Sequence, residues 1–378
     1  MEFETFIPRA IVMDSVRVMP FSALAPAELA KWDEFQRARR ELESPYFRPE
    51  FVGAVAEVTP CVEVAVIERD GRPIGFFPFE RDWLGVGGPV GGSLSDFHGV
   101  IAGKDPQLSI CELLAQCRLH AWDFQSAPAG QSLLEAFAAR CDAAYFLDLS
   151  AGFDAYCMRR KKDGSETIEK TQRKQRRMIR EERMRFEPRC RDPQLLDTLL
   201  TWKDRRYQEL GVVSPVQGPR TKDLIERLLK NDSPELETFL SVVWAGETPA
   251  AIGLTLRSGP AAHLWLIGFH EAFSHYSPGL ILVLQLAEQL AGEGVQRLHL
   301  GRGRERFKSS LATDQELVAA GIAGSWSMVY AGVTGWRWCK QRVKDSPLGA
   351  VVRRLQPVRY WLAYGKTAPP KAEPVATR

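Results

Sequence analysis

Alternating and continuous apolar runs divide the chain into two halves that repeat one order of elements. In the first half, β-rich runs flank Asp70-Gly71, and an Asp-Gly pair between such runs is a strong hairpin signal. The pattern therefore predicts a hairpin over residues 61–81. The elements predicted after it are a strand at 97–103, a helix at 105–120 and a strand at 121–125.

The second half follows the same order. Two β-rich runs around the glycine turn at Gly246 predict a hairpin over residues 240–259. The elements predicted after it are a strand at 261–269, a helix at 279–291 and a strand at 295–300. Because hairpin, strand, helix and strand occur twice, we expect a tandem pair of α/β domains, each with a mostly antiparallel sheet and a crossover helix.

A basic segment separates the two halves. Residues 159–191 contain fourteen Lys and Arg against six Asp and Glu, a local charge of +8, so the rest of the chain carries 3 − 8 = −5. The run 167–184 lacks Pro and Gly, and Arg173, Arg177 and Arg180 share one face of the helix that it predicts. Apolar partners are sparse, so we expect an exposed helix that bridges the domains. The predicted boundaries are 1–158, 159–184, 185–332 and 333–378, the last being basic helical pieces and a disordered tail.

The start of the predicted helix at 279–291 has the features of an anion site. Ser277 is a favourable N-cap, Pro278 suits the first helical position, and Gly279 allows a ligand to approach the backbone. The backbone N–H groups of Gly279, Leu280 and Ile281 would then be free to bind a phosphate or diphosphate. The competing interpretation is a well-capped buried helix that binds nothing.

Two cations follow the next predicted strand. Arg302 stands between two glycines, and Lys308 lies six residues later. Both fit a polyanionic ligand beside a helix N-terminus, although most Lys and Arg side chains are simply solvated.

Composition excludes several classes of protein. The seven cysteines form no CxxC pair and have no histidine at ligand spacing, which argues against a metal site and favours a reducing compartment. No run of about 18 apolar residues predicts a membrane span, and the N-terminus has no signal-peptide core. We therefore expect a cytoplasmic protein, with peripheral affinity for a membrane or an anionic glycan as one use of the basic helix.

These motifs together resemble a known family. The order of strands, the YSPG run at Tyr276–Gly279, the LGRGRERFK run at Leu300–Lys308 and the arginine-rich RKQRRMIREERMRFE resemble the GNAT-fold acyltransferase domain of the CelD/BcsL type. These proteins are associated with cellulose or exopolysaccharide biosynthesis and are FemAB-like in carrying two such folds. The resemblance covers residues 159–311 well and the first half loosely. It implies an α/β (α+β) protein of two tandem GNAT-like domains, the first degenerate and on the acceptor side.

The resemblance also implies a donor and a reaction. Acyl-CoA would donate an acyl group to a small-molecule or glycan acceptor, such as a sugar precursor of an envelope polysaccharide. A splay between the strands at 261–269 and 295–300 would admit the pantetheine arm, and residues 277–281 would receive the pyrophosphate. The sequence departs from the family by keeping one glycine in HYSPGL, by His299 in place of an acid and by Phe307 in place of a tyrosine.

The candidate catalytic groups surround that helix start. Acyl transfer needs a base, for which His270 and His299 are the candidates, while Tyr276 could protonate the leaving thiolate and Glu305 lies just beyond the strand. Glu271, in the loop beside His270, is a candidate for binding the acceptor. Each of these residues also has a purely structural interpretation as a surface, packing or hydrogen-bonded side chain.

The first half offers a glycine-rich loop with a polar tip. Asp96 and His98 follow four glycines there, and they could contact the acceptor or form an ordinary Asx-capped turn.

Two other functions fit the same residues. An aminoacyl transferase of the FemAB type would take its donor from tRNA, using Arg173, Arg177 and Arg180 on phosphates. A non-catalytic GNAT-like scaffold in a polysaccharide-biosynthesis complex would account for the reduced glycine loop.

Overall fold

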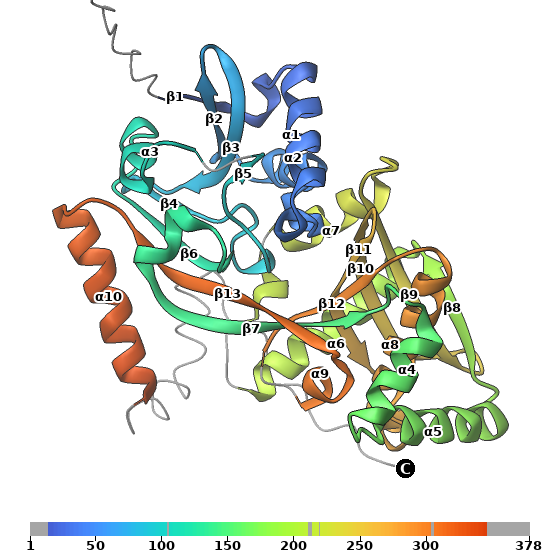
Figure 1. Cartoon of the computed structure of the whole chain (residues 1–378). Coiled ribbons are helices and arrows are strands. Elements are labelled where there is room, and N and C mark those ends of the chain that lie inside the picture. The colour runs from blue at the N-terminus through green and yellow to red at the C-terminus, as the bar shows by residue number, and fades with distance from the viewer. Residues whose placement is uncertain (1–13, 104–105, 211–213, 219, 304–305, 346–378) are drawn as a thin grey trace, which may run out of the picture. The chain divides into compact units, whose positions relative to one another are not determined.

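The structure is a computed structural model that describes residues 14–103, 106–210, 214–218, 220–303 and 306–345 (Figure 1). The chain divides into two compact units. The first comprises Met1–Ala144 and Glu316–Tyr330, and the second comprises Tyr145–Gln315 and Ala331–Arg378. Residues of β13 (Asp314–Ala323) belong to the first unit because this strand pairs antiparallel with β6 (Ala121–Pro128). The predicted domain boundaries stay a prediction.

The first unit is a mixed sheet with three α-helices. The strand order is β1-β2-β3-β4-β6-β13, and β5 pairs with β3. The remaining strands are β1 (Ser15–Pro20), β2 (Val62–Arg69), β3 (Arg72–Arg81), β4 (Val86–Gly88) and β5 (Ile101–Ala102). The helices are α1 (Pro26–Ala38), α2 (Pro49–Val58) and α3 (Ile110–Gln116), with 3-10 turns η1 (Phe21–Ala23), η2 (Arg40–Leu42), η3 (Pro45–Phe47), η4 (Gly92–Leu94) and η5 (Ser132–Phe137).

Local signals account for much of this unit. The predicted hairpin is confirmed, because Asp70 and Gly71 both have positive φ (52° and 70°), as a two-residue type I′ turn requires. The predicted helix at 105–120 is shorter than expected. It begins at Ile110, where Ser109 and Glu112 form a capping box.

The second unit is also a mixed sheet, in the order β7-β12-β11-β10-β9-β8. Its strands are β7 (Ala138–Asp148), which begins in the first unit, β8 (Arg185–Cys190), β9 (Glu237–Ala245), β10 (Thr248–Ser258), β11 (Ala261–Phe269) and β12 (Arg297–Arg302). Its helices are α4 (Phe153–Lys162), α5 (Thr167–Glu182), α6 (Pro193–Glu209), α7 (Thr221–Lys230), α8 (Pro278–Gly292) and α9 (Arg306–Leu311), with 3-10 turns η6 (Pro215–Gln217) and η7 (Glu271–Tyr276). Helix α10 (Met328–Asp345) begins in the first unit and continues into the second from Ala331.

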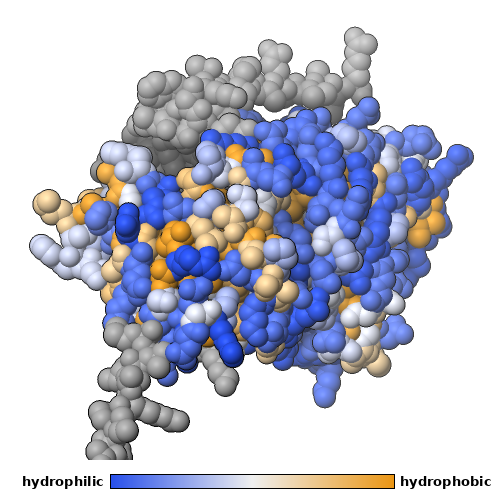
Figure 2. Space-filling view, turned by 90° about the horizontal axis from the view of Figure 1, so that it is seen from above, coloured by the Kyte–Doolittle hydropathy of each residue, from blue (hydrophilic) through white to orange (hydrophobic). Residues whose placement is uncertain are grey.

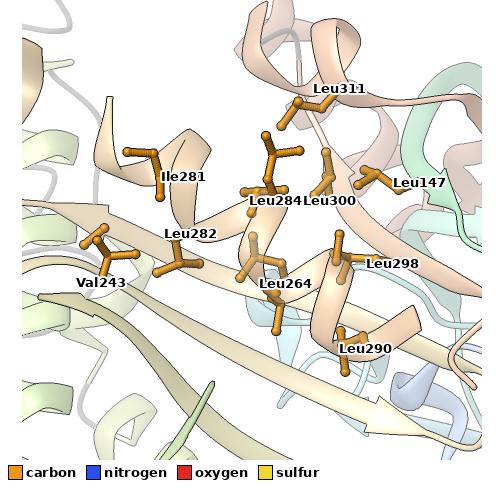
Figure 3. Packing of buried hydrophobic residues seen from close by; sticks show 14 of the residues in the cluster. Leu147, Val243, Leu264, Ile281, Leu282, Leu284, Leu290, Leu298, Leu300 and Leu311 are labelled. Carbon is orange, nitrogen blue, oxygen red and sulfur yellow. The ribbon is translucent and has the colours of Figure 1, made fainter. Parts of the chain in front are cut away.

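Helix α8 is the centre of the core of this unit. Its apolar side chains pack with Leu264, Leu298 and Leu300 of the neighbouring strands (Figure 3). A Cβ built on Gly253 of β10 would meet Leu282 of α8, whereas one built on Gly268 of β11 would meet α6. Helices α8 and α6 therefore cover opposite faces of the sheet, as in a layered α/β domain.

The basic helix α5 belongs to the second unit. Ile168, Thr171 and Met178 are buried along one side of α5, and the helix contacts α8 and η7. It is therefore packed within this unit rather than standing free as a bridge, although its arginines remain exposed.

The surface is largely polar. Figure 2 shows one face on which hydrophilic residues surround smaller groups of hydrophobic ones. None of the helices within the described residues is both long and apolar enough to cross a membrane. The predicted C-terminal tail lies outside the described residues.

Candidate functional site

Strands β11 and β12 pair over only part of their length. The parallel register joins Ala261–His263 to Arg297–His299. Beyond His263, β11 continues to Phe269, and beyond His299, β12 continues to Arg302. The two strands therefore run side by side at one end and separate toward their carboxyl ends.

A β-bulge accompanies the separation. The register between β10 and β11 shifts between Leu254/Thr255, whose partners are Leu266 and Leu264, so Trp265 is the extra residue. A bulge bends its strand and increases the local twist. Because Trp265 lies two residues past the last pair with β12, the bend coincides with the parting of the strands.

The start of α8 lies against the separated part of β11. A Cβ built on Gly279 would stand 3.6 Å from Cδ1 of Ile267 and 3.8 Å from Cδ1 of Phe269. The side chain of Phe269 is 48% exposed. This arrangement places an accessible aromatic ring and a helix N-terminus beside the parted strands.

The helix start differs from the prediction in its donors. Ser277 adopts a left-handed conformation (φ 57°), and its side chain does not cap the helix. The backbone N–H groups of Leu280 and Ile281 lie 3.0 and 3.2 Å from the carbonyl oxygen of Ser277. Two of the three predicted donors are therefore already engaged, and Gly279 is the remaining one.

Lys174 of α5 supplies a positive charge at this point. Its Nζ donates to Oγ of Ser277 at 2.7 Å, across 103 positions in the sequence. Within the part of the chain that the structure describes, no carboxylate pairs with Lys174. A half-buried ammonium beside the positive end of a helix favours an anion there.

Tyr276 is part of the same contact. Its hydroxyl donates to Oε2 of Glu181 at 2.6 Å, and the guanidinium of Arg177 lies 5.4 Å from the ring centroid. The hydrogen bond to Glu181, together with burial, raises the pKa of Tyr276 to about 12. Since an ordinary thiol has a pKa of about 8.5, transfer of this proton to a thiolate is unfavourable. The hydrogen bond favours a structural role for Tyr276, and its role as an acid stays a prediction.

His270 also has a structural contact. Its Nδ1 accepts a hydrogen bond from the backbone N–H of Ala272 at 3.2 Å, which caps η7. A neutral imidazole that accepts at Nδ1 carries its proton on Nε2. The Nδ1 of His270 is therefore engaged in this contact, and its role as the base stays a prediction. Glu271 beside it is exposed.

His299 is a buried residue at the point where β11 and β12 part. It is 2% exposed, and its ring stacks on that of His263, with centroids 6.0 Å apart and an interplanar angle of 9°. Phe146 packs against it at 5.5 Å. Two imidazoles from adjacent strands thus meet at the last paired position of β11 and β12.

Lys308 and Arg302, the two cations predicted to bind a polyanionic ligand, both lie in the protein interior or at its edge. Lys308 is 8% exposed, and its Nζ donates to the carbonyl oxygen of Arg302. Its side chain therefore bonds the end of β12 and does not face solvent. Arg302 is half-buried at that strand end. Glu305 lies outside the described residues.

Asp96 and His98 occupy ordered positions in the first unit. Nε2 of His98 accepts from the backbone N–H groups of Gln125 and Ser126, both at 2.9 Å. Burial, together with the charge of Asp96, raises the pKa of Tyr46. His98 is 7% exposed, and these two hydrogen bonds connect its loop to β6. Contact of either residue with an acceptor stays a prediction.

The chain is similar to one protein-family model and to several solved structures. Residues 165–309 match the family model described as an acetyltransferase (GNAT) domain. The structure overlaps the C-terminal domain of a putative lysylphosphatidylglycerol synthetase from Agrobacterium fabrum with a TM-score of 0.51, at 12% identity, over 85% of this chain and 97% of that one. A FemX crystal structure overlaps with a TM-score of 0.54, at 10% identity, over 81% and 96% of the two chains.

The region that matches the GNAT model lies within the second unit. The two overlaps above 0.5 show a fold shared with those chains, and the predicted mixed α/β class is confirmed. A tandem GNAT protein from the clavulanic acid pathway also overlaps, at a TM-score of 0.46 and 10% identity, over 83% of this chain and all of that one. A search of curated proteins found no significant match.

The region that matches the GNAT model contains two residues near the candidate site that the sequence analysis did not select. Lys174 appeared only as one of many basic residues on α5, and His263 only as part of an apolar strand. The isolated histidine within AAHLWLIGF was the available signal for His263, because a histidine in a buried strand calls for a specific partner. No cluster of three metal-ligating side chains occurs among the described residues.

Proposed function

We propose that the protein is an acyl-CoA-dependent acyltransferase whose donor binds where β11 and β12 part. The observation that carries this proposal is the register of the two strands, which ends at His263 and His299 although both strands continue. A gap between hydrogen-bonded strands exposes backbone N–H and C=O groups that can pair with the amides of a pantetheine arm.

The start of α8 would hold the diphosphate of the donor. The free N–H of Gly279 and the ammonium of Lys174 would supply one backbone donor and one charge. The sequence analysis predicted three successive backbone N–H donors for the diphosphate. The proposed site has one backbone N–H and one ammonium for the same ligand. The exposed ring of Phe269 would pack against the donor near the mouth of the gap.

His299 is the base that the geometry favours. In the reaction, an amine or hydroxyl of the acceptor attacks the thioester carbonyl, a C–N or C–O bond forms, and the C–S bond breaks. The acceptor's proton would pass to His299, and coenzyme A would leave as the thiolate and be protonated by water. His270 is excluded from this role in our proposal because its Nδ1 already accepts from Ala272.

The acceptor that we propose is a sugar-containing precursor of an envelope polysaccharide. This choice rests on the resemblance of the motifs at Tyr276–Gly279 and Leu300–Lys308 to the CelD/BcsL type. Glu271, exposed beside the gap, is the acidic side chain best placed to meet a hydroxyl or amine of such an acceptor.

Binding and turnover test the proposal separately. Calorimetry with acetyl-CoA and longer acyl-CoAs should show binding, and release of free thiol in the presence of amino sugars should report turnover. We expect His299→Ala to lower kcat by about 10²–10⁴-fold while leaving donor affinity unchanged. The matched control is His270→Ala, for which we expect an effect on kcat below about tenfold. Absence of binding by every acyl-CoA would refute the proposal.

A second function is favoured by one surface feature. Arg173, Arg176, Arg180 and Arg183 are exposed along α5, and no ion pair joins them to a carboxylate among the described residues. Such a stripe suits the phosphates of an aminoacyl-tRNA donor. Binding of charged tRNA that weakens steeply with salt and with Arg173→Ala would favour this function over the acyl-CoA-dependent one.

A further inference from the structure

A group of exposed hydrophobic side chains lies on α10 and just before it. Trp326 is 84% exposed, Met328 88%, Trp336 70% and Trp338 60%. Single exposed hydrophobic residues are common on soluble proteins, but three tryptophans and a methionine within thirteen positions form a patch. Patches of this kind mark a binding surface.

Met328 and Trp336 belong to one stripe along the helix, and Trp338 lies on the opposite flank of that stripe. Met328, Gly332, Gly335, Trp336 and Cys339 recur at the spacing i, i+4, i+7, i+8 and i+11, which places them on a single stripe. A Cβ built on Gly332 or on Gly335 would have no atom within 4 Å. Among the described residues, nothing covers the stripe at its two glycines, and the exposed side chains of Met328 and Trp336 lie on either side of them.

The segment is mostly basic, and the acidic residue of α10 is Asp345 at its end. Residues 326–344 contain four basic residues, Arg337, Lys340, Arg342 and Lys344, and no acidic one. The guanidinium of Arg342 lies 4.8 Å from the centroid of the Trp338 ring. Tryptophan beside arginine is the combination that suits the boundary between lipid headgroups and acyl chains, because each side chain has an apolar part and a polar end.

We propose that α10 binds the surface of an anionic lipid bilayer, lying in the plane of the headgroups with the Met328–Trp336 stripe inserted. Arg337 and Arg342 would meet lipid phosphates, at about 1 kcal/mol for each charge near the surface. Because the helix is not both long and apolar enough to cross a membrane, it would lie on the surface. The proposal does not depend on the acyltransferase function.

Helix α5 provides the contrast that favours α10. It is more strongly charged, but its apolar residues Ile168 and Met178 are buried within the second unit. It can attract a polyanion but has little to insert into lipid. A nucleic acid would meet the cations of α10 and stack on its tryptophans, but would leave Met328 and the glycine stripe unburied. An anionic lipid bilayer would contact both the cations and the apolar side chains of α10.

Vesicle binding by the full-length protein tests this proposal. We expect flotation with vesicles of phosphatidylcholine containing phosphatidylglycerol, and much less with phosphatidylcholine alone. The double variant Trp336→Ser/Trp338→Ser should lower the partition coefficient about tenfold or more. The matched control is Trp83→Ser, since Trp83 is 90% exposed in the first unit, and its partition coefficient should stay within about twofold of the wild type. Brominated lipids should quench the fluorescence of the wild type and of the control more than that of the double variant.

Charge is tested by a second pair of variants. Arg342→Glu should weaken binding to anionic vesicles and reduce its salt dependence, whereas Arg72→Glu, at the exposed start of β3, should not. The proposal is overturned if the double tryptophan variant binds vesicles as well as the wild type. It is also overturned if those tryptophans instead hold two copies of the chain together in sedimentation, or are needed for binding single-stranded RNA while vesicles are not bound.

Discussion

The Nζ of Lys174 lies 2.7 Å from the Oγ of Ser277, so a lysine of the basic helix reaches the residue that precedes α8. The contact joins the segment with the highest positive charge to the helix start that we propose as the diphosphate site. Its partner is a neutral hydroxyl, so the charge of Lys174 is not compensated by this bond. An anionic ligand would compensate it.

Replacing Lys174 by methionine should therefore weaken donor binding more than it weakens the fold. We expect the Kd for acetyl-CoA to rise about five- to thirtyfold, the range that loss of one charge-assisted hydrogen bond produces. Calorimetry at two salt concentrations measures it, and the difference between the two salts should shrink in the variant. Lys170→Met is the control, because Lys170 pairs with Glu166 on the exposed side of the same helix. An equal loss in both variants would show a general effect of charge.

Gly279→Asp separates the stability of the helix from the binding of its ligand. A Cβ at this position meets only ordinary contacts at 3.6 Å or more, so the side chain can be accommodated. A carboxylate in the first turn interacts favourably with the helix macrodipole, by about 0.3–1 kcal/mol. We thus expect an unchanged or slightly higher Tm together with at least about a tenfold loss of acyl-CoA affinity. Retained affinity would place the diphosphate elsewhere.

Tyr276→Phe tests whether the tyrosine is an acid or a support. Because its hydroxyl donates to Glu181 and its pKa is about 12, we expect kcat to fall less than about tenfold. Stability should fall by about 1–2 kcal/mol, since a hydrogen bond to a carboxylate is lost. Denaturant unfolding and thiol release measure the two effects. A fall in kcat of about 10²-fold or more with an unchanged Tm would restore the acid role.

Elements specified by neighbouring residues were predicted closely. Strand β11 occupies the predicted positions, Ala261–Phe269, and α8 begins at Pro278, one residue before the predicted range. The hairpin at Asp70-Gly71 follows from the backbone preferences of those two residues. Each of these signals is contained within a few positions of the chain.

Contacts between residues far apart in the sequence could not be predicted from local patterns. Lys174 and Ser277 are 103 positions apart, and only the packing of α5 on α8 brings them together. The stacking of His263 on His299 depends on the register of two parallel strands separated by a helix. The capping role of Ser277 was predicted from residue type, but its left-handed backbone directs the hydroxyl to Lys174 instead.

The far end of α8 is held by a cluster of ion pairs that should give the fold a defined acid sensitivity. Glu293 contacts Arg189 and Arg257, each at 2.5 Å, and Arg189 also bonds Glu237 at 2.7 Å. The hydrogen bond from Arg189 lowers the pKa of Glu293 from 4.5 to about 2. A carboxylate whose pKa is depressed in the folded state stabilises it above the unfolded pKa, and that contribution is lost as the pH falls from about 4.5 to about 2.

Glu293→Gln should accordingly lower the free energy of unfolding at pH 7 by about 2–3 kcal/mol and flatten its dependence on pH between about 4.5 and 2. Urea unfolding at a series of pH values measures both effects. Glu288→Gln, on the exposed side of the same helix, is the matched control, and we expect a change of no more than about 0.5 kcal/mol. If the Glu293 variant keeps the acid-dependent slope of the wild type, the cluster does not stabilise α8 through this carboxylate, and other acidic groups account for the slope.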